Sequence, residues 1–293
     1  MWRTRWTTWT FLLPAVITLL AVGIYPLLFA VSISFRQYEL TKPNLGFGFT
    51  GLSNYAQVFS DSTFWASLGR TFTFLATVLP VQILLGLLIA LLLNLPGLRV
   101  LKTITRVALV VPLATTYAVV GLMGRLIFNS DFGVLNWFLE YVLGVDAVAW
   151  LGRPNTAFLS IAAMDIWQWT PFVALIFLAG LSNVPTDIEE AAKLETDRWY
   201  LILRHIQLPY LLPGLTAILI LRTADILKLF DMVFVMTRGG PGTATELISI
   251  YVQRIGFRVF NQGVASAQAV LMLIITIILA RIYIRVFYRE VST

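Results

Sequence analysis

Residues 186–209 read TDIEEAAKLETDRWYLILRHIQLP, and two long apolar segments lie on either side of this stretch. It holds the densest run of charge in a chain in which only 12% of the residues are charged. Thr186 or Asp187 can cap a helix, and the helix dipole favours acidic residues in the first turn. We therefore predict a short helix that begins here and carries Glu190 and Leu194, four residues apart, on one face.

A second short helix fits residues 198–206, and we expect Pro209 to end it, because proline lacks the backbone donor that a helix interior needs. Its polar side includes His205, the single histidine of the chain. Two short amphipathic helices between apolar segments predict a docking element for a soluble partner. A generic amphipathic cytoplasmic loop is the alternative interpretation.

Within this stretch, Glu190-Ala191-Ala192 is followed at a fixed spacing by Ile206-Gln207-Leu208-Pro209. The two motifs together resemble the signature of permease subunits of binding-protein-dependent ABC importers. The resemblance is strongest to the carbohydrate branch, of the maltose and glycerol-3-phosphate type. It extends over about residues 50–290, with further parts at residues 51–55, 167–172 and 230–242.

The resemblance implies that residues 183–209 form a cytoplasmic coupling loop, whose first helix sits in a cleft of an ATPase subunit. Glu190 is then the ionic anchor, and Ala191 and Ala192 permit close approach. The family usually has glycine where this chain has Thr196, and threonine disfavours the positive φ that glycine permits. The implied ATPase-coupling residues are Glu190, Ala191, Ala192, Leu194, Thr196, Ile206, Leu208 and Pro209.

The composition predicts an integral membrane protein, because 58% of the residues are hydrophobic and the mean hydropathy is +0.83. The apolar runs are long enough to cross a hydrocarbon layer of about 30 Å. We predict an all-α membrane protein with six transmembrane helices in one domain over residues 1–293, and the resemblance implies the type I ABC importer permease fold. The predicted spans are residues 9–35, 67–95, 106–128, 156–181, 210–236 and 264–287.

The net charge of +6 is explained by cations that flank the spans, so it indicates membrane topology rather than a nucleic-acid partner. Six spans place both termini and the coupling loop on one side, where Lys and Arg are more numerous, so that side is cytoplasmic. The first apolar run, about 25 residues, is too long for a signal-peptide core and reads as an uncleaved span. Its flank carries Arg3 and Arg5 and the interface aromatics Trp2, Trp6 and Trp9. We expect a multi-pass protein of the bacterial cytoplasmic (inner) membrane.

Several classes of site are excluded by what the sequence lacks. There is no cysteine, which excludes thiol chemistry and disulfides. No P-loop lysine motif occurs, and neither a zinc-protease nor a serine-hydrolase motif is present. We therefore expect no catalytic residue and no metal site on this chain, with ATP and Mg bound by partner ATPase subunits.

The predicted fifth span carries four ionisable residues at intervals of three, alternating in sign. They are Arg222, Asp225, Lys228 and Asp231. Such a helix cannot face lipid, because charges within a bilayer need partners or water. Two interpretations stay open: an internally neutralised ladder that holds the helices together, or the polar lining of a translocation path.

The predicted fourth span offers Asp165, Gln168, Trp169 and Phe172, which share a helix face, beside Pro171. A carboxylate and an amide next to an aromatic plane suit a sugar, which has hydroxyl groups at its edge and an apolar C–H face. Packing between helices is the alternative role.

These observations predict a permease subunit that moves a mono- or oligosaccharide by alternating access. The expected partners are a second permease subunit in a heterodimer, two ATPase subunits, an extracytoplasmic solute-binding protein and the lipid bilayer. The first alternative is the same machinery with glycerol-3-phosphate, a polyol or another small polar solute as cargo. The second is an ion-coupled secondary transporter, which would use the intramembrane charges and need no ATPase.

Overall fold

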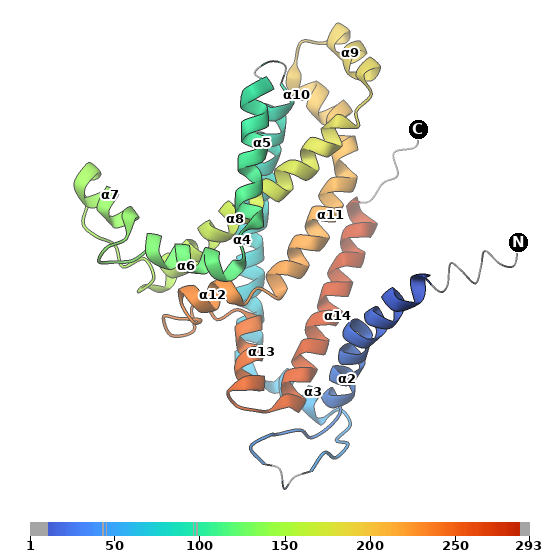
Figure 1. Ribbon diagram of the computed structural model, residues 1–293, viewed down its shortest axis with the longest axis vertical. Helices are drawn as coiled ribbons and strands as arrows, with labels where there is room; N and C mark the ends of the chain where they lie inside the picture. Colours follow the sequence, from blue (N-terminus) through green and yellow to red (C-terminus); the bar gives the residue numbers. More distant parts are fainter. Residues whose placement is uncertain (1–10, 43, 45, 96, 98, 288–293) are drawn as a thin grey trace, which may run out of the picture. The chain divides into compact units, whose positions relative to one another are not determined.

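The computed structural model describes residues 11–287 apart from residues 43, 45, 96 and 98 (Figure 1). The terminal residues named above lie outside the described part; they are Arg3, Arg5, Trp2, Trp6 and Trp9. Regular structure in the described part is helical, and its extended segments meet in two isolated bridges, Arg36 with Phe49 and Glu39 with Asn261. Residues 11–18 are helical and lead into the first labelled element. With α for an α-helix and η for a π-helix, the labelled elements are η1 (Leu19–Ile24), α2 (Tyr25–Ser34), α3 (Ser53–Ser60), α4 (Ser62–Asn94), α5 (Arg99–Ala114), α6 (Tyr117–Ile127), α7 (Val134–Leu143), α8 (Pro154–Ser182), α9 (Thr186–Glu195), α10 (Trp199–Ile202), η3 (Leu203–Gln207), α11 (Leu208–Leu227), α12 (Asp231–Met236), α13 (Ile248–Phe257) and α14 (Gln262–Phe287).

Long apolar helices dominate the described residues, as the composition predicts. Five of them can cross a bilayer: Phe11–Ser34, Ser62–Asn94, Pro154–Ser182, Trp199–Leu227 and Gln262–Phe287. A sixth span is present if Lys102–Ala114 and Tyr117–Ile127, which are bent by 97° from each other, count as one. The predicted spans at residues 67–95, 156–181 and 264–287 correspond to α4, α8 and α14. The all-α fold class is confirmed, while the third and fifth spans differ from the prediction.

The predicted third span, residues 106–128, is broken rather than straight. α5 ends at Ala114 and α6 begins at Tyr117, and between them Thr116 has an extended backbone with ψ 151°. The side-chain amide of Gln168 donates to the carbonyl of Thr115 at 2.8 Å. A tertiary hydrogen bond thus satisfies a carbonyl that a continuous helix would have used, and this allows the bend within the membrane region.

The predicted fifth span, residues 210–236, is wrong at its C-terminal end. α11 ends at Leu227, residues 228–230 are not helical, and the chain becomes helical again at Asp231. The hydroxyl of Ser249 donates to the carbonyl of Leu229 inside this interruption. The backbone polar groups released by the break are therefore partly satisfied from another part of the chain.

Close packing between α6 and α12 explains why the chain leaves the axis of α11. A Cβ atom at Gly121 of α6 would lie 2.9 Å from the carbonyl oxygen of Met232 on α12. Only glycine allows two helix backbones to approach so closely, and small residues at contacts are how helices associate in lipid. α12 is thus held by α6 rather than by continuation of α11.

The described chain divides into two compact units, Met1–Trp65 with Tyr251–Ile275 and Ala66–Ile250 with Thr276–Thr293. The division points fall inside α4, α13 and α14. In the larger unit the core gathers side chains of α4, α8, α11 and α12, among them the completely buried Val173, Ile218 and Met232. Folding of residues 1–293 as a single permease domain stays a prediction.

Candidate functional site

Helix α9 begins directly after Pro185, which occupies the N-cap position, and the predicted side-chain cap is absent. Asp187 and Glu189 lie in the first turn, where the helix dipole favours negative charge. Glu189 also pairs with Lys193 at 2.8 Å, one helical turn further on. The helix is therefore stabilised by its own charge pattern instead of by a cap.

One face of α9 is left uncovered by the described chain. Asp187, Glu190, Ala191 and Leu194 have the i, i+3, i+4, i+7 spacing of a helix face, and all four are exposed. Leu194 is 90% exposed, so its apolar surface has no intramolecular contact of consequence. Glu190 makes no ion pair within the part of the chain that the structure describes. A charged and apolar face of this kind is available to a partner.

Thr196 adopts an extended backbone, φ −154° and ψ 137°, at the C-terminal end of α9. Its hydroxyl accepts a hydrogen bond from the backbone N–H of Arg198 at 3.2 Å, which closes the turn to the next helix. The turn therefore needs no positive φ at this position, and threonine replaces glycine without backbone strain.

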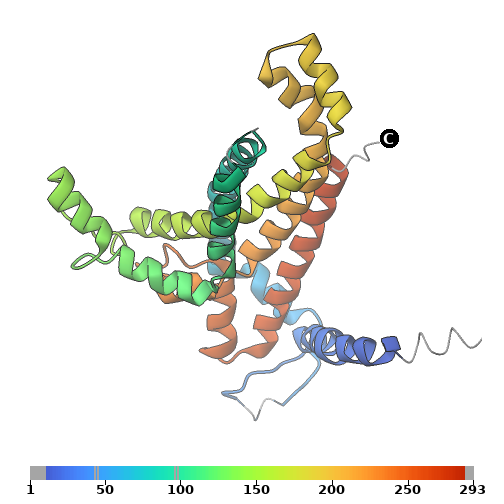
Figure 2. The same ribbon diagram turned by 45° about the horizontal axis from the view of Figure 1, so that its top comes forward.

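The second short helix is not a separate element, and Pro209 does not end it. α10, the π-helical segment η3 and α11 form one helix from Trp199 to Leu227 (Figure 2). Pro209 lies in the first turn of α11, just after η3. The π-helical turn of η3 is wider than an α-helical turn and changes the backbone hydrogen-bonding pattern at the position where proline has no N–H to donate. Ile206, Leu208 and Pro209 thus lie in a helix that continues directly into the fifth span.

A groove of about 750 Å³ separates α9 from the end of α4. Its walls are largely apolar and include Leu91 and Leu92 of α4 and Trp199 and Ile202 of α10, and Lys193 of α9 also lines it. α9 itself contacts α10 and η3. Because α9 is supported mainly by the start of the fifth-span helix, a force on α9 acts on that helix first.

A buried ion pair joins α8 to α11. Nη2 of Arg222 donates to Oδ2 of Asp165 at 2.6 Å, and both side chains are completely buried. Gln82 of α4 donates to the same Oδ2 at 2.8 Å and accepts from Nε of Arg222 at 3.1 Å. Three helices are thus tied at one point, because a charge buried among apolar helices needs a partner and further hydrogen bonds.

Aromatic rings surround this ion pair. The guanidinium carbon of Arg222 lies 4.5 Å from the centre of the Trp169 ring, a cation–π contact. The Trp169 ring in turn lies 5.9 Å from the ring of Tyr117 and 5.6 Å, edge-on, from that of Phe172. The structure therefore places Asp165 and Trp169 against Arg222 and Phe172 against Trp169. Gln168, the fourth predicted residue, is next to Trp169 in sequence, and its amide donates to the carbonyl of Thr115.

Several buried polar atoms without a hydrogen-bond partner among the described residues belong to this cluster or to the residue next to Trp169 in sequence. They are Oδ1 of Asp165, Nη1 of Arg222, Oε1 of Gln168, Nε1 of Trp169 and the hydroxyl of Tyr117. The set contains donors and acceptors beside an indole face. This combination can bind the hydroxyl groups of a polar solute if the surrounding helices move apart.

The continuous charged stripe predicted for the fifth span does not form. Asp225 pairs with Lys228 at 2.9 Å and lies 4.0 Å from Nη1 of Arg222. Lys228 follows the end of α11 and its side chain is 71% exposed, and Asp231 lies exposed on α12 with no ion pair among the described residues. Only Arg222 belongs to the buried cluster; the other three charges lie at its partly exposed margin, because the helix ends before the pattern does.

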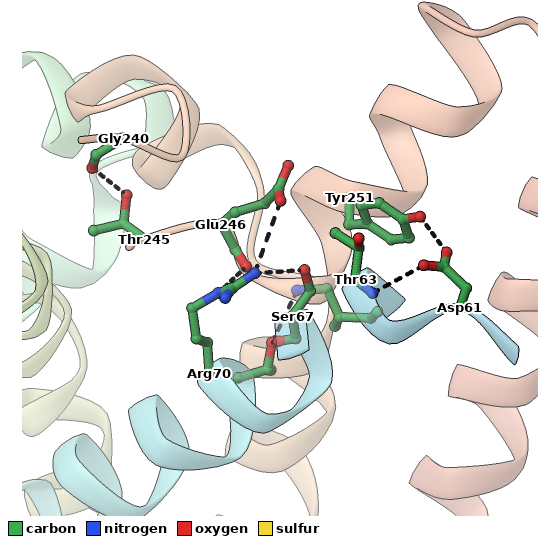
Figure 3. Close-up of polar contacts among 10 residues, drawn as sticks. Asp61, Thr63, Ser67, Arg70, Gly240, Thr245, Glu246 and Tyr251 are labelled. Carbon is green, nitrogen blue, oxygen red and sulfur yellow. Dashed lines mark hydrogen bonds and ion pairs between the residues drawn. The ribbon is translucent and has the colours of Figure 1, made fainter. Parts of the chain in front are cut away.

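The segment that follows α12 is held to the start of α4 by polar contacts (Figure 3). Arg70 donates to the backbone oxygen of Glu246 at 3.0 Å and lies 3.8 Å from its carboxylate. The turn at residues 237–242 is closed by Thr245, whose hydroxyl donates to the carbonyl of Gly240 at 2.8 Å. The glycine-rich turn is thus held by hydrogen bonds within the chain.

Sequence reasoning missed Gln82, Tyr117 and Arg70. Gln82 could have been indicated by its position in the middle of the apolar run of the second span, since buried amides require partners. Nothing in the sequence indicates which distant group each of the three contacts. Within the described residues, no group of three or more His, Cys, Asp or Glu side chains is arranged to hold a metal ion.

The chain resembles known proteins over most of its length. The family described as "Binding-protein-dependent transport system inner membrane component" matches residues 82–293. The trehalose/maltose transport system permease protein MalF of Thermococcus litoralis is 35% identical, over 94% of this chain and 91% of that protein. The sulfoquinovosyl glycerol transport system permease protein SmoG of Agrobacterium fabrum is 33% identical, over 96% and 94%.

A solved structure has a similar fold. It is that of a bacterial alginate ABC transporter in complex with an alginate pentasaccharide-bound periplasmic protein, and one of its chains matches with a TM-score of 0.81. The match covers 99% of this chain and 97% of that chain at 19% sequence identity, so the similarity concerns the fold alone.

Proposed function

The chain belongs to the family of binding-protein-dependent transport system inner membrane components, and from this premise we propose that it is the carbohydrate-translocating permease subunit of an ATP-driven importer. The family is that of ABC transporter permeases, which are non-catalytic, multi-pass membrane subunits, and the type I importer fold implied by the two motifs is confirmed. The observation that carries the proposal is the uncovered face of α9, mounted on a helix that runs unbroken into the membrane.

In the proposed mechanism, an ATPase subunit binds the α9 face through Glu190 and the exposed side chain of Leu194. Closure of the ATPase dimer moves α9, and the motion passes through the turn at Thr196 to α10. Because α10, η3 and α11 form one helix, the fifth span tilts with it, and the membrane helices alternate between inward- and outward-facing states. ATP and Mg bind the ATPase subunits in this scheme, and this chain binds neither.

The cargo we propose is a mono- or oligosaccharide. Two relatives are named for transport of trehalose/maltose and of sulfoquinovosyl glycerol. In this chain, Asp165, Gln168 and Tyr117 carry unpartnered polar atoms, and the rings of Tyr117 and Trp169 are in contact, a combination that suits hydroxyl groups next to a C–H face. Glycerol-3-phosphate, a polyol or another small polar solute is the alternative cargo for the same machinery.

The proposed assembly pairs this chain with a second permease, two ATPase subunits and an extracytoplasmic solute-binding protein. The orientation we propose places α9 and both termini in the cytoplasm, and the segments between spans one and two and between spans five and six outside. The clustering of Lys and Arg beside the short loops supports this orientation.

A charge reversal tests the coupling role. We expect Glu190→Arg to leave the complex inserted but to reduce both substrate-stimulated ATP hydrolysis and uptake into proteoliposomes at least tenfold, the loss typical of a central interface contact that costs about 2 kcal/mol or more. The matched control is Asp197→Arg, which also reverses an acidic charge at an exposed position, in the turn after α9 and not on that helix face.

Equal activity of the Glu190→Arg variant and the wild type would count against the coupling assignment. Solute uptake by this chain in vesicles without ATPase subunits would support the ion-coupled alternative instead. Co-purification of the ATPase subunits with each variant separates loss of docking from loss of folding.

A further inference from the structure

The smaller unit contains a polar cavity, separate in sequence from the buried cluster around Arg222. It has a volume of about 460 Å³ and lies among the segment after α2, the start of α3 and the segment before α14. Every lining side chain carries a hydrogen-bonding group, and those that matter here are Gln37, Tyr38, Glu39, Ser53, Gln57 and Asn261. A cavity with so little apolar lining is not a site for lipid or for an apolar ligand.

The walls of this cavity are fixed by the buried side chain of Asn54. Its amide nitrogen donates to the carbonyl of Ser34 at 2.9 Å and to that of Arg36 at 2.8 Å, which ties α3 to the end of α2. Gly263 permits this arrangement, because a Cβ atom there would lie 2.5 Å from the carbonyl oxygen of Arg36. Asn54 is 8% exposed, so the clamp is protected from water and the cavity is pre-formed.

The opposite wall is held by backbone pairing. The N–H of Gly263 donates to the carbonyl of Tyr38 at 3.1 Å, and the N–H of Leu40 donates to that of Phe260 at 3.0 Å. The ring of Tyr38 packs edge-on against Phe47, with 5.1 Å between ring centres. The cavity is thus formed by positioned groups and not by loose loops.

The groups that line the cavity are available for a ligand. The side-chain amides of Gln37 and Gln57 and the hydroxyl of Ser53 make no hydrogen bond within the described residues, and Gln57 and Ser53 are exposed. Glu39 pairs with Lys42 at 3.0 Å, so the lining charges neutralise each other. An array of free amides and a hydroxyl without net charge favours a neutral ligand rich in hydroxyl groups over a phosphate or an ammonium ion.

We propose that this cavity is a binding site for a neutral mono- or disaccharide. The amides of Gln37 and Gln57 hydrogen-bond pairs of hydroxyl groups, Tyr38 supplies an aromatic surface, and the volume lies in the range of small-ligand sites, about 300–1,000 Å³. The location of the cavity on the outer side, as a station before the transmembrane path, rests on the proposed function. A side chain of the solute-binding protein is the competing occupant.

The test uses the assembled transporter in lipid nanodiscs without its solute-binding protein. Glucose, trehalose and maltotriose are titrated separately, and binding is followed by saturation-transfer difference NMR. The variants are Gln37→Ala and Gln57→Ala, and the matched control is Gln253→Ala on α13 in the same unit, outside the cavity. We expect at least one sugar to bind, each cavity variant to weaken it about fivefold for the loss of an amide hydrogen bond, and the control to bind as the wild type does.

Three results overturn the inference: no binding of any of the three sugars, equal weakening in the control, or unchanged sugar binding in both cavity variants. Weaker capture of the solute-binding protein with unchanged sugar binding assigns the cavity to that protein. The proposed function fails separately, when the wild-type transporter shows no ATP-driven sugar uptake in proteoliposomes. If ATP-driven sugar uptake continues and the cavity variants bind sugar as the wild type does, only the proposed cavity site is rejected.

Discussion

The buried pair of Arg222 and Asp165 permits a quantitative test of how the larger unit is held together. The change is Asp165→Asn, which keeps the shape of the side chain and removes its charge. Arg222 is then left completely buried, with one hydrogen bond to Gln82 and, as its remaining ion-pair partner, only the more distant Asp225 at 4.0 Å. Arginine does not release its proton in proteins, so the charge persists in the variant.

We expect Asp165→Asn to lower the free energy of unfolding strongly, because it leaves a charge buried away from water without its closest partner. Removal of one partner of a buried ion pair typically destabilises a protein by about 3–5 kcal/mol, whereas an exposed pair contributes about 0–1 kcal/mol. The matched control is Asp225→Asn, the same chemical change on the other carboxylate near Arg222, whose side chain is 20% exposed. We expect the control to cost less than about 1 kcal/mol.

The assay is equilibrium unfolding of the purified subunit in mixed micelles, followed by tryptophan fluorescence because Trp169 lies against Arg222. A double variant, Asp165→Leu with Arg222→Met, removes both charges and is expected to be more stable than Asp165→Asn alone. The reasoning is refuted if Asp165→Asn costs no more than Asp225→Asn. The single variants Asp165→Leu and Arg222→Met are measured as well. The reasoning is also refuted if the double variant loses as much free energy of unfolding as these two single variants together, since the pair would then have no coupling.

Two further predictions concern the backbone. Thr196→Gly is expected to lower the midpoint of thermal unfolding slightly, by the equivalent of about 0.5–1 kcal/mol, and to leave ATPase coupling intact. The reason is that Thr196 has an extended backbone, which does not require the positive φ that glycine permits. A gain in stability would show that the turn is strained. Gly121→Ala places a Cβ atom 2.9 Å from the carbonyl of Met232 and is expected to cost about 1–3 kcal/mol by forcing α12 from α6. Gly69→Ala, where no atom lies within 4 Å of the new Cβ, is its control in the same unfolding measurement, and equal stability of the two variants would contradict the close packing.

The exposed face of α9 was predictable because it depends on local spacing. Glu190 and Leu194 are four residues apart, and helical geometry alone places them on one side. Their functional role stays a prediction, since a partner is needed to test it. The end of the second short helix was predicted wrongly at Pro209, because the rule that proline ends a helix does not account for a π-helical turn just before it.

Some members of the buried cluster were predictable, but Gln82, Tyr117 and the contacts within the cluster were not. Asp165, Trp169 and Arg222 could be identified from the sequence because polar residues in apolar runs are rare and need partners. That Arg222 pairs with Asp165 across helices, rather than only with Asp225 on its own helix, could not be identified. The competing i, i+3 pair was equally consistent with the sequence, and the distance between α8 and α11 decides between them.

By itself, the sequence determined the membrane class, the approximate positions of the apolar helices and the family, because hydrophobic run length and motif spacing are properties of the chain in one dimension. Only the tertiary structure decided where the third and fifth spans break. The apolar pattern continues through both breaks, and each break exists because groups distant in sequence, Gln168 at Thr115 and Ser249 at Leu229, satisfy the backbone carbonyls. In a bilayer an unsatisfied carbonyl is too costly to expose, so a helix can end there only where another part of the fold supplies the hydrogen bond.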